Sequence, residues 1–349
     1  MIKRYRDYPL SQLNSFGVDV IAADYIYFET RKDIYDLINK KEFDLDNFFL
    51  IGGGCNLLFL EDFTGSLLHC GIEGISVIDE SEKDVLISVG AGCWWDSVVK
   101  WCVDREYYGI ENLSYIPGTM GAAVVQNIGA YGSEIKDVLN KVEYVDINSA
   151  EKYYLRGDEC KMGYRSSLFK SKLKNRAVIT SVCLKLSKKP SFNLSYGNLK
   201  VFVESKWSEI TLNNVRSSVI EIRKSKLPDY KVFGNAGSFF KNPVVNLDIY
   251  RELQLKFDDI PGYVIDRGDQ IKIPAAWLIE KAGWKGYSEN NVAVHSEQPL
   301  VLINKGGATG AQIYSLSKAI MEDIKDKFEI TLEREVEVVS SNLKQQLLE

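Results

Sequence analysis

The residues with the clearest potential for chemistry are the glycines of one uncharged run, from Ile116 to Gly132. The run reads Ile-Pro-Gly-Thr-Met-Gly-Ala-Ala-Val-Val-Gln-Asn-Ile-Gly-Ala-Tyr-Gly, and no Asp, Glu, Lys or Arg occurs between Glu111 and Glu134. Glycine lets a backbone approach a ligand closely. Successive N–H groups form a concavity that binds anions without a charged side chain. The run therefore indicates a cradle for a phosphate-bearing ligand, although a tightly packed buried turn explains the same spacing.

A second glycine cluster follows a short apolar stretch. Residues 48–51 (Phe-Phe-Leu-Ile) predict a strand that leads directly into Gly52 to Asn56, which read Gly-Gly-Gly-Cys-Asn. A strand that ends in glycines is a frequent phosphate-binding geometry. The cluster has neither the GxGxxG spacing before a helix nor the lysine of a P-loop, so the context excludes both motifs.

Histidine is scarce, since His69 and His295 are the only two in the chain. A histidine relay or a histidine-ligated metal site has few candidates, and each histidine is more often structural than catalytic. We expect no metal, and we expect any proton chemistry to depend on Ser, Glu, Lys or Tyr.

Bulk properties narrow the class of protein. A chain of 349 residues predicts two or three domains, and 45% hydrophobic with 26% charged residues is ordinary for a globular protein. The net charge of −5 argues against a nucleic-acid partner. No apolar run approaches the ~20 residues that span a bilayer, and no signal peptide is recognisable. The six cysteines show no CxxC pairing, which favours a cytoplasmic chain with reduced thiols.

The elements that must position these residues mix helices and strands without a regular βαβ alternation. We expect strands at 24–30, 48–51, 84–90, 142–147, 177–186 and 330–338, helices at 32–41, 94–105, 213–226, 275–282 and 309–328, and a loop or short helix at 160–170. With two separated glycine clusters near the start, this order favours α+β subdomains that enclose a ligand over a doubly wound sheet.

Five motifs occur in a recognisable order: Ile51–Asn56, Ile116–Gly132, Tyr164–Arg165, Gly234–Pro243 and Leu332–Val336. Together they resemble the UDP-N-acetylenolpyruvoylglucosamine reductase family, flavoenzymes that complete UDP-N-acetylmuramate for bacterial peptidoglycan. The resemblance covers nearly the whole chain. The stretch 194–199 (Leu-Ser-Tyr-Gly-Asn-Leu) resembles the tyrosine loop of the family's first type.

The resemblance implies an α+β architecture: a two-subdomain FAD-binding fold of the vanillyl-alcohol-oxidase (PCMH) type and a C-terminal α+β substrate domain. The expected domains are FAD-binding subdomain 1 at 1–74, joined by the C-terminal tail 333–349, FAD-binding subdomain 2 at 75–217, and the substrate-binding domain at 218–332.

The resemblance also implies non-covalent FAD and NADPH as co-substrate. The residues that would bind FAD are Gly52, Gly53, Gly54, Cys55, Asn56, Pro117, Gly118, Gly121, Asn127 and Gly129. The family commonly has Ser and Pro where this chain has Cys55 and Val124. Cysteine is a poor hydrogen-bond donor, so one phosphate contact is lost or passes to a backbone group. We expect FAD binding to survive this change.

In the family reaction NADPH delivers hydride to the flavin, and hydride then passes from flavin N5 to C3 of the enolpyruvyl group while a proton reaches C2. The resemblance implies that Arg165 binds the substrate carboxylate, that Ser238 donates the proton, and that Glu335 polarises the developing enolate. Glu335 would act as a neutral acid if burial raises its pKa. Without the resemblance, Arg165 would be interpreted as a surface ion-pair partner and Ser238 as a turn residue. Glu335 would be one glutamate of a solvated row.

Four further positions carried over from the family would bind the sugar nucleotide: Tyr196, Lys226, Asn242 and Gln298. Two alternatives stay open, namely another FAD-dependent sugar or lactone oxidoreductase on the same fold and a sugar-nucleotide-binding protein without catalysis. The expected partners are the UDP-sugar and NADPH, with no nucleic acid and no membrane insertion. We expect a cytoplasmic protein, and of the possible oligomeric states the monomer is favoured. The sequence does not independently separate NADPH from NADH.

Overall fold

The computed structural model describes residues 1–265 and 268–341, and the chain forms two compact units. The first unit contains Met1–Tyr8, Ala22–Gly54 and Thr64–Ser225, and the second contains Pro9–Ile21, Cys55–Phe63 and the chain from Lys226 onward. The predicted division into three domains stays a prediction, and the last eight residues of the predicted tail (342–349) lie outside the described residues.

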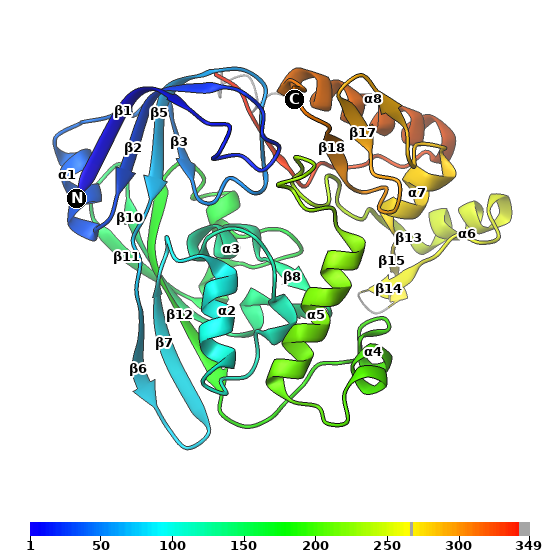
Figure 1. Cartoon of the computed structure of the whole chain (residues 1–349), viewed down its shortest axis with the longest axis horizontal. Helices are drawn as coiled ribbons and strands as arrows, with labels where there is room; N and C mark the ends of the chain where they lie inside the picture. Colours follow the sequence, from blue (N-terminus) through cyan, green and yellow to red (C-terminus); the bar gives the residue numbers. More distant parts are fainter. Residues whose placement is uncertain (266–267, 342–349) are drawn as a thin grey trace. The chain divides into compact units, whose positions relative to one another are not determined.

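One sheet of the first unit has the strand order β1-β2-β5-β3 (Figure 1). Its strands are β1 (Ile2–Pro9), β2 (Ile21–Phe28), β5 (Phe63–Cys70) and β3 (Phe48–Ile51), and β3 runs parallel to β5. Helix α1 (Arg31–Asn39) packs its apolar side against this sheet, where Ile26, Phe28 and Ile34 are fully buried.

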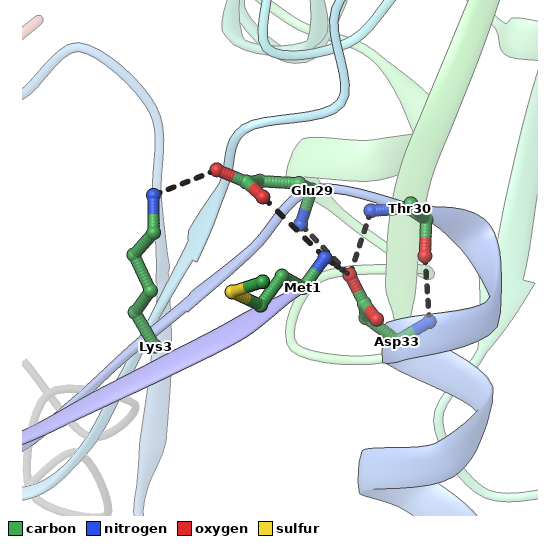
Figure 2. A network of polar contacts seen from close by, with 5 residues as sticks. All are labelled: Met1, Lys3, Glu29, Thr30 and Asp33. Carbon is green, nitrogen blue, oxygen red and sulfur yellow. Dashed lines mark hydrogen bonds and ion pairs between the residues drawn. The ribbon is translucent and has the colours of Figure 1, made fainter.

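The start of α1 is fastened to the chain's first residue (Figure 2). Thr30 Oγ1 accepts the Asp33 N–H at 3.1 Å, and Asp33 Oδ2 accepts the Thr30 N–H at 3.0 Å, which completes a capping box. The same Asp33 oxygen accepts the Met1 ammonium at 2.8 Å. Although burial alone raises the pKa of Asp33, these hydrogen bonds bring it below its usual value. Lys3 pairs with Glu29 beside this network.

Replacing the N-cap residue tests this arrangement. We expect Thr30→Ala to lower the free energy of unfolding by about 1 kcal/mol, because an orphan helix N–H loses its acceptor. Thr30→Ser, which keeps the hydroxyl, should restore most of the loss. Urea unfolding of the three proteins measures the effect, and an unchanged midpoint in Thr30→Ala would show that the cap contributes nothing.

The larger sheet of the first unit has the order β11-β10-β12-β7-β6 with antiparallel neighbours throughout. Its strands are β6 (Ile75–Glu80), β7 (Asp84–Gly90), β10 (Leu139–Asp146), β11 (Lys152–Arg156) and β12 (Ala177–Ser187). Helices α2 (Trp95–Val103) and α3 (Met120–Gln126) share its core, in which Trp95, Met120 and Val182 are fully buried. Helices α4 (Leu199–Lys206) and α5 (Leu212–Lys226) follow one another in the sequence and share a small apolar cluster.

The second unit combines short sheets with helices. Its elements are β4 (Leu57–Phe59), β13 (Val244–Asn246), α6 (Leu247–Lys256), β14 (Tyr263–Ile265), β15 (Gln270–Lys272), α7 (Ala275–Lys281), β16 (Ser288–Glu289), β17 (Val292–Val294), β18 (Leu302–Asn304), α8 (Gly310–Phe328) and β19 (Glu337–Val339). The parallel pair β4–β19 joins an early segment of the chain to its last described strand. The long helix α8 buries Ile313, Ile320 and Ile324 in this unit.

Most predicted elements occur within a few residues of the expected bounds, but two segments differ. The predicted strand 330–338 is a strand only at β19, because the strict alternation of buried residues ends after Ile330 and Leu332, and the next buried residues, Val336 and Val339, follow at spacings of four and three. The predicted glycine cradle contains helix α3, whose inward residues Met120, Ala123 and Val124 have helical spacing.

Candidate functional site

The two glycine clusters meet inside the first unit. A Cβ atom added at Gly53 would lie 3.0 Å from the Cα of Gly118 and 3.0 Å from the Trp94 ring. A Cβ at Gly52 would lie 2.5 Å from Thr119 Oγ1. The two backbones therefore approach so closely that only glycine fits, as a shared phosphate cradle requires.

The first half of the run is fastened to the segment ahead of α2. The N–H of Trp95 donates to the Gly118 carbonyl at 2.9 Å, and the N–H of Gly121 donates to the Ala91 carbonyl at 2.9 Å. A Cβ at Gly121 would lie 3.2 Å from the Ala91 methyl. Gly121 thus serves close packing with its N–H already bonded, which differs from the N–H donation to a ligand that its spacing predicted.

The second half of the run holds the loop that carries Arg165. Asn127 is fully buried, has a left-handed backbone (φ +45°), and donates from Nδ2 to the Gly163 carbonyl at 2.7 Å. Gly129 accepts Arg165 Nη2 at 3.1 Å, and a Cβ there would lie 3.2 Å from Nη1. The N–H of Asn127 is bonded to the Val124 carbonyl. Two predicted cofactor positions therefore hold the predicted catalytic arginine.

The tyrosine loop is tied to the end of the run. Asn112 donates from Nδ2 to the carbonyls of Tyr131 (2.8 Å) and Asn193 (2.7 Å), and Asn193 donates to the Gly132 carbonyl at 2.9 Å. The ring of Tyr196 lies 6.3 Å from the Tyr131 ring, nearly perpendicular to it, and Tyr196 is 57% exposed. The first unit thus brings Tyr196, Arg165 and both glycine clusters into one region.

Arg223 of α5 is a candidate residue that the sequence analysis missed. Burial lowers the pKa of its guanidinium; the neighbouring Tyr131 and Asp96 oppose this shift, and the Arg165 guanidinium adds to it. Its Nε donates to the Tyr115 carbonyl at 3.2 Å. Among the described residues no carboxylate is hydrogen-bonded to it. A lone arginine in a helix carries no motif, so only the fold could identify it.

Ser238 lies in the second unit, on a turn with clear local causes. Asn235 Oδ1 accepts the Gly237 N–H at 3.0 Å, and Gly237 is left-handed (φ +71°), a conformation that favours glycine. Phe239, which follows, is fully buried and anchors the segment. Ser238 itself is half-buried and pairs with Val301 in a β-bridge.

Glu335 lies on a segment that pairs with the one after Ser238. Its N–H donates to the Phe239 carbonyl at 2.8 Å, so the two predicted catalytic residues occupy neighbouring extended segments of the second unit. Asn56, a predicted cofactor residue, donates from Nδ2 to the Glu335 carbonyl at 3.1 Å.

The remaining predicted substrate residues have distinct surroundings. Asn242 accepts the Ala275 N–H at 2.9 Å through Oδ1, which anchors the start of α7. The N–H of Gln298 donates to His295 Nδ1 at 3.2 Å, in the turn that precedes Val301. Lys226 is the exposed last residue of α5.

Burial shifts the pKa values of two side chains, His69 and Cys55, far from their ordinary values. His69 Nδ1 lies 2.6 Å from the Tyr25 hydroxyl, and burial lowers the pKa of His69 to about 4, so its ring is neutral at physiological pH. Burial raises the pKa of the Cys55 thiol to about 12, and all six cysteines are free thiols. Within residues 1–265 and 268–341, no cluster of His, Cys, Asp or Glu could hold a metal ion, and no helix is long and apolar enough to cross a membrane.

Comparison with known proteins supports the interpretation of the two glycine clusters as part of a cofactor-binding domain. Residues 23–151 match the family model described as FAD binding domain, and residues 228–339 match UDP-N-acetylenolpyruvoylglucosamine reductase, C-terminal domain. The fold and the site define an FAD-dependent oxidoreductase with mixed α+β architecture, as the sequence predicted.

Two relatives identify the family within this class of oxidoreductases. The chain is 43% identical over 332 residues to UDP-N-acetylenolpyruvoylglucosamine reductase of Bacteroides fragilis (strain YCH46), covering 95% of this chain and 99% of that protein. It is 41% identical to the same-named protein of Amoebophilus asiaticus (strain 5a2), covering 95% and 98%. The chain belongs to the UDP-N-acetylenolpyruvoylglucosamine reductase family, which confirms the resemblance.

A solved structure shows the same fold. The UDP-N-acetylenolpyruvylglucosamine reductase of Thermus caldophilus superposes with a TM-score of 0.68 at 21% identity, covering 97% of this chain and 99% of that one. The predicted fold class is therefore confirmed, whereas the roles predicted for single residues stay predictions.

The glycine contact yields a direct test. We expect Gly53→Ala to destabilise the protein by about 1–3 kcal/mol, because the new methyl overlaps the Gly118 backbone. The bound flavin should fall in parallel, as measured by thermal unfolding and by flavin content. The control is Gly163→Ala, whose methyl would meet only the Ser166 Cβ at 3.8 Å and should leave the melting temperature nearly unchanged. Equal melting temperatures for the two variants would contradict the close approach.

Proposed function

We propose that this chain reduces the enolpyruvyl group of UDP-N-acetylglucosamine-enolpyruvate to give UDP-N-acetylmuramate, with FAD as cofactor and NADPH as reductant. The observation that carries the proposal is family membership over 95% of the chain, with an FAD-binding domain and the family's C-terminal domain both present. This membership favours the reductase over a sugar or lactone oxidase and over a binding protein without catalysis.

The residues present fit the cofactor, because a Cβ added at Gly118 would meet nothing within 4 Å, which leaves space for a pyrophosphate beside that backbone. All ten predicted FAD-binding residues remain candidates; the N–H groups of Gly121 and Asn127 are already bonded within the chain, so any contact of these two with FAD would use other atoms. When bound, FAD supplies hydride transfer between NADPH and the substrate.

Arg165 would bind the substrate carboxylate. It is half-buried, and the Gly129 carbonyl and the left-handed backbone of Arg165 (φ +52°) orient its planar guanidinium. A guanidinium fork matches a carboxylate in geometry and charge. As the reaction moves negative charge onto the carboxylate and C2, a guanidinium already in place stabilises the transition state more than the ground state.

Ser238 would donate the proton that C2 receives. Its turn is held from both sides, by the Asn235 side chain and by buried Phe239, so its hydroxyl needs little ordering during the reaction. Glu335, on the neighbouring segment, would polarise the enolate and organise the proton. Tyr196 and Lys226 would contact the diphosphate and uridine end, and Asn242 and Gln298 would add polar contacts. The cytoplasmic location and the monomeric state stay predictions from sequence.

The proton-donor role separates the two half-reactions. Ser238→Ala should keep NADPH-driven bleaching of the flavin and lose flavin reoxidation by the enolpyruvyl substrate about 100-fold or more, the range for a missing general acid. Stopped-flow absorbance measures both rates. Ser205→Ala, at an exposed helix serine, should change neither rate. A variant that loses both half-reactions equally would remove Ser238 from this role.

The reaction as a whole has a simpler test. The purified protein should show flavin absorbance that bleaches with NADPH and returns on addition of the sugar nucleotide. A protein without flavin absorbance, or one whose reduced flavin is reoxidised rapidly by oxygen without the sugar nucleotide, would contradict the proposal.

A further inference from the structure

A hollow in the first unit has no part in the proposed function. Its volume is about 380 Å³, and it is lined by residues of β1, β2 and β5 and of the chain that follows α1, all of them outside the two glycine clusters. A hollow of this volume is large enough for a small molecule, since ligand sites begin at about 300 Å³. The charged side chains that line it are Arg4, Arg6, Asp24, Lys41, Glu42 and Asp44.

A buried carboxylate arranges the two arginines of this hollow. Asp24 is 4% exposed and accepts Nε and Nη2 of Arg4 at 2.7 and 2.8 Å. Its Oδ2 also accepts the Ser66 hydroxyl at 2.9 Å, and Nη1 of Arg6 lies 3.6 Å from its Oδ1. A bidentate pair of this kind fixes the orientation of the guanidinium. One buried negative charge therefore holds two guanidinium groups at the wall of the hollow, which leaves one positive charge unbalanced.

The other two carboxylates of the lining have partners outside this arginine pair. Asp44 Oδ1 accepts two backbone N–H groups of the residues that follow it, at 3.0 and 3.2 Å. Glu42 lies 3.8 Å from the Lys40 ammonium. Within residues 1–265 and 268–341, no carboxylate lies within 4 Å of the Lys41 ammonium. The charges available to a ligand in the hollow are therefore those of Lys41 and Arg6, and both are positive.

Lys41 follows α1 in a backbone conformation that glycine usually provides at a helix end. It is left-handed (φ +52°), and its N–H donates to the Ile38 carbonyl at 3.1 Å. The next N–H, that of Glu42, donates to the Leu37 carbonyl at 2.9 Å. These bonds satisfy the last carbonyls of the helix without the lysine side chain. Other helix ends of this chain also have residues other than glycine in this conformation, so what distinguishes Lys41 is its place in the hollow beside two guanidinium groups.

We propose that this hollow is a binding site for a phosphate or diphosphate group of a small molecule, held by Arg6 and Lys41 and supported by the Arg4–Asp24 pair. A guanidinium fork matches the oxygens of a phosphate, and an ammonium adds a point charge. The site goes beyond the proposed function and does not depend on it. Because Arg6 belongs to β1 and Lys41 follows α1, a bound anion would join the two elements and stabilise the folded chain.

Inorganic pyrophosphate is the probe, titrated into the holoenzyme by calorimetry. We expect Lys41→Gly and Arg6→Met each to raise its dissociation constant about fivefold or more, the size of one charged contact at a partly exposed site. Binding in the hollow should leave the flavin absorbance unchanged, which separates it from any binding beside the cofactor. A parallel titration with uridine diphosphate identifies the source of the phosphate. A larger lysine-dependent change with that probe indicates a nucleotide, and a larger one with pyrophosphate indicates free phosphate.

A second lysine provides a matched control. Lys161 is also exposed and left-handed (φ +48°), but it lies outside the lining of the hollow. Lys161→Gly and Lys41→Gly remove the same side chain and charge from the same backbone conformation. Both should raise the melting temperature of the protein without pyrophosphate, because glycine adopts this conformation without steric cost. Lys41→Gly should then lose affinity for the probe, and Lys161→Gly should keep it.

Several results would overturn the site. Wild-type protein that fails to bind either probe would do so, as would unchanged affinity in Arg6→Met. An equal loss of affinity in Lys41→Gly and Lys161→Gly would mean that the anion responds only to the overall charge of the protein. A lower melting temperature in Lys41→Gly would mean that the fold itself requires this lysine. Bleaching of the flavin by NADPH is unaffected by all of these results, so the proposed function is tested separately.

Discussion

The close approach of two backbones at Gly53 and Gly118 is the constraint on which the first unit depends. A Cβ at Gly53 would lie only 3.0 Å from the Gly118 Cα, whereas Gly118 has space beside it and requires glycine for its left-handed backbone (φ +116°). The bonds from Trp95 and Gly121 then fix the run against the segment ahead of α2. Because the contact consists of backbone, the proposed cradle would bind a pyrophosphate through backbone N–H groups rather than through charged side chains, as its uncharged sequence requires.

The same run has a second function in the structure. Its first half forms the cradle, and its second half, from Asn127 onward, holds the Arg165 loop and the tyrosine loop by backbone carbonyls and buried amides. The proposed cofactor cradle and the support of the proposed substrate arginine are therefore parts of one continuous segment. A change that disturbs the cradle is expected to reach Arg165 through α3, and the division between residues that hold FAD and residues that do chemistry is less sharp than the motif order suggested.

The sequence could predict those features that depend on local pattern. Helices such as α5 and α8 have apolar residues at helical spacing, and the strands β3 and β7 are short apolar or alternating stretches. Their predicted bounds therefore lie close to the observed ones. In the segment 330–338 the buried residues alternate only in the first half, so a prediction from alternation alone made the strand longer than it is. The strand β1 is mostly exposed and carries little apolar pattern, so no strand was expected there.

The site itself could be predicted only where a motif marks it. Arg165 and Ser238 stand in recognisable motifs, but their supports, Asn127 and Asn235, were assigned other roles or none. Arg223 has no motif at all, because its distinguishing property is desolvation, and desolvation is a property of the packed fold rather than of neighbours in sequence.

The electrostatics of the first unit follow from this packing. An acidic chain, with net charge −5, nevertheless contains an arginine, Arg223, whose guanidinium pKa is lowered by burial. Proteins accept such a local cost at functional or strained sites. Arg216 holds both oxygens of Asp96, and the same carboxylate accepts the Tyr115 N–H, while Arg223 donates to the Tyr115 carbonyl. Two arginines of α5 therefore hold the turn directly before the glycine run, one through a carboxylate and one directly, and the left-handed backbone of Tyr115 (φ +59°) is kept in place by both.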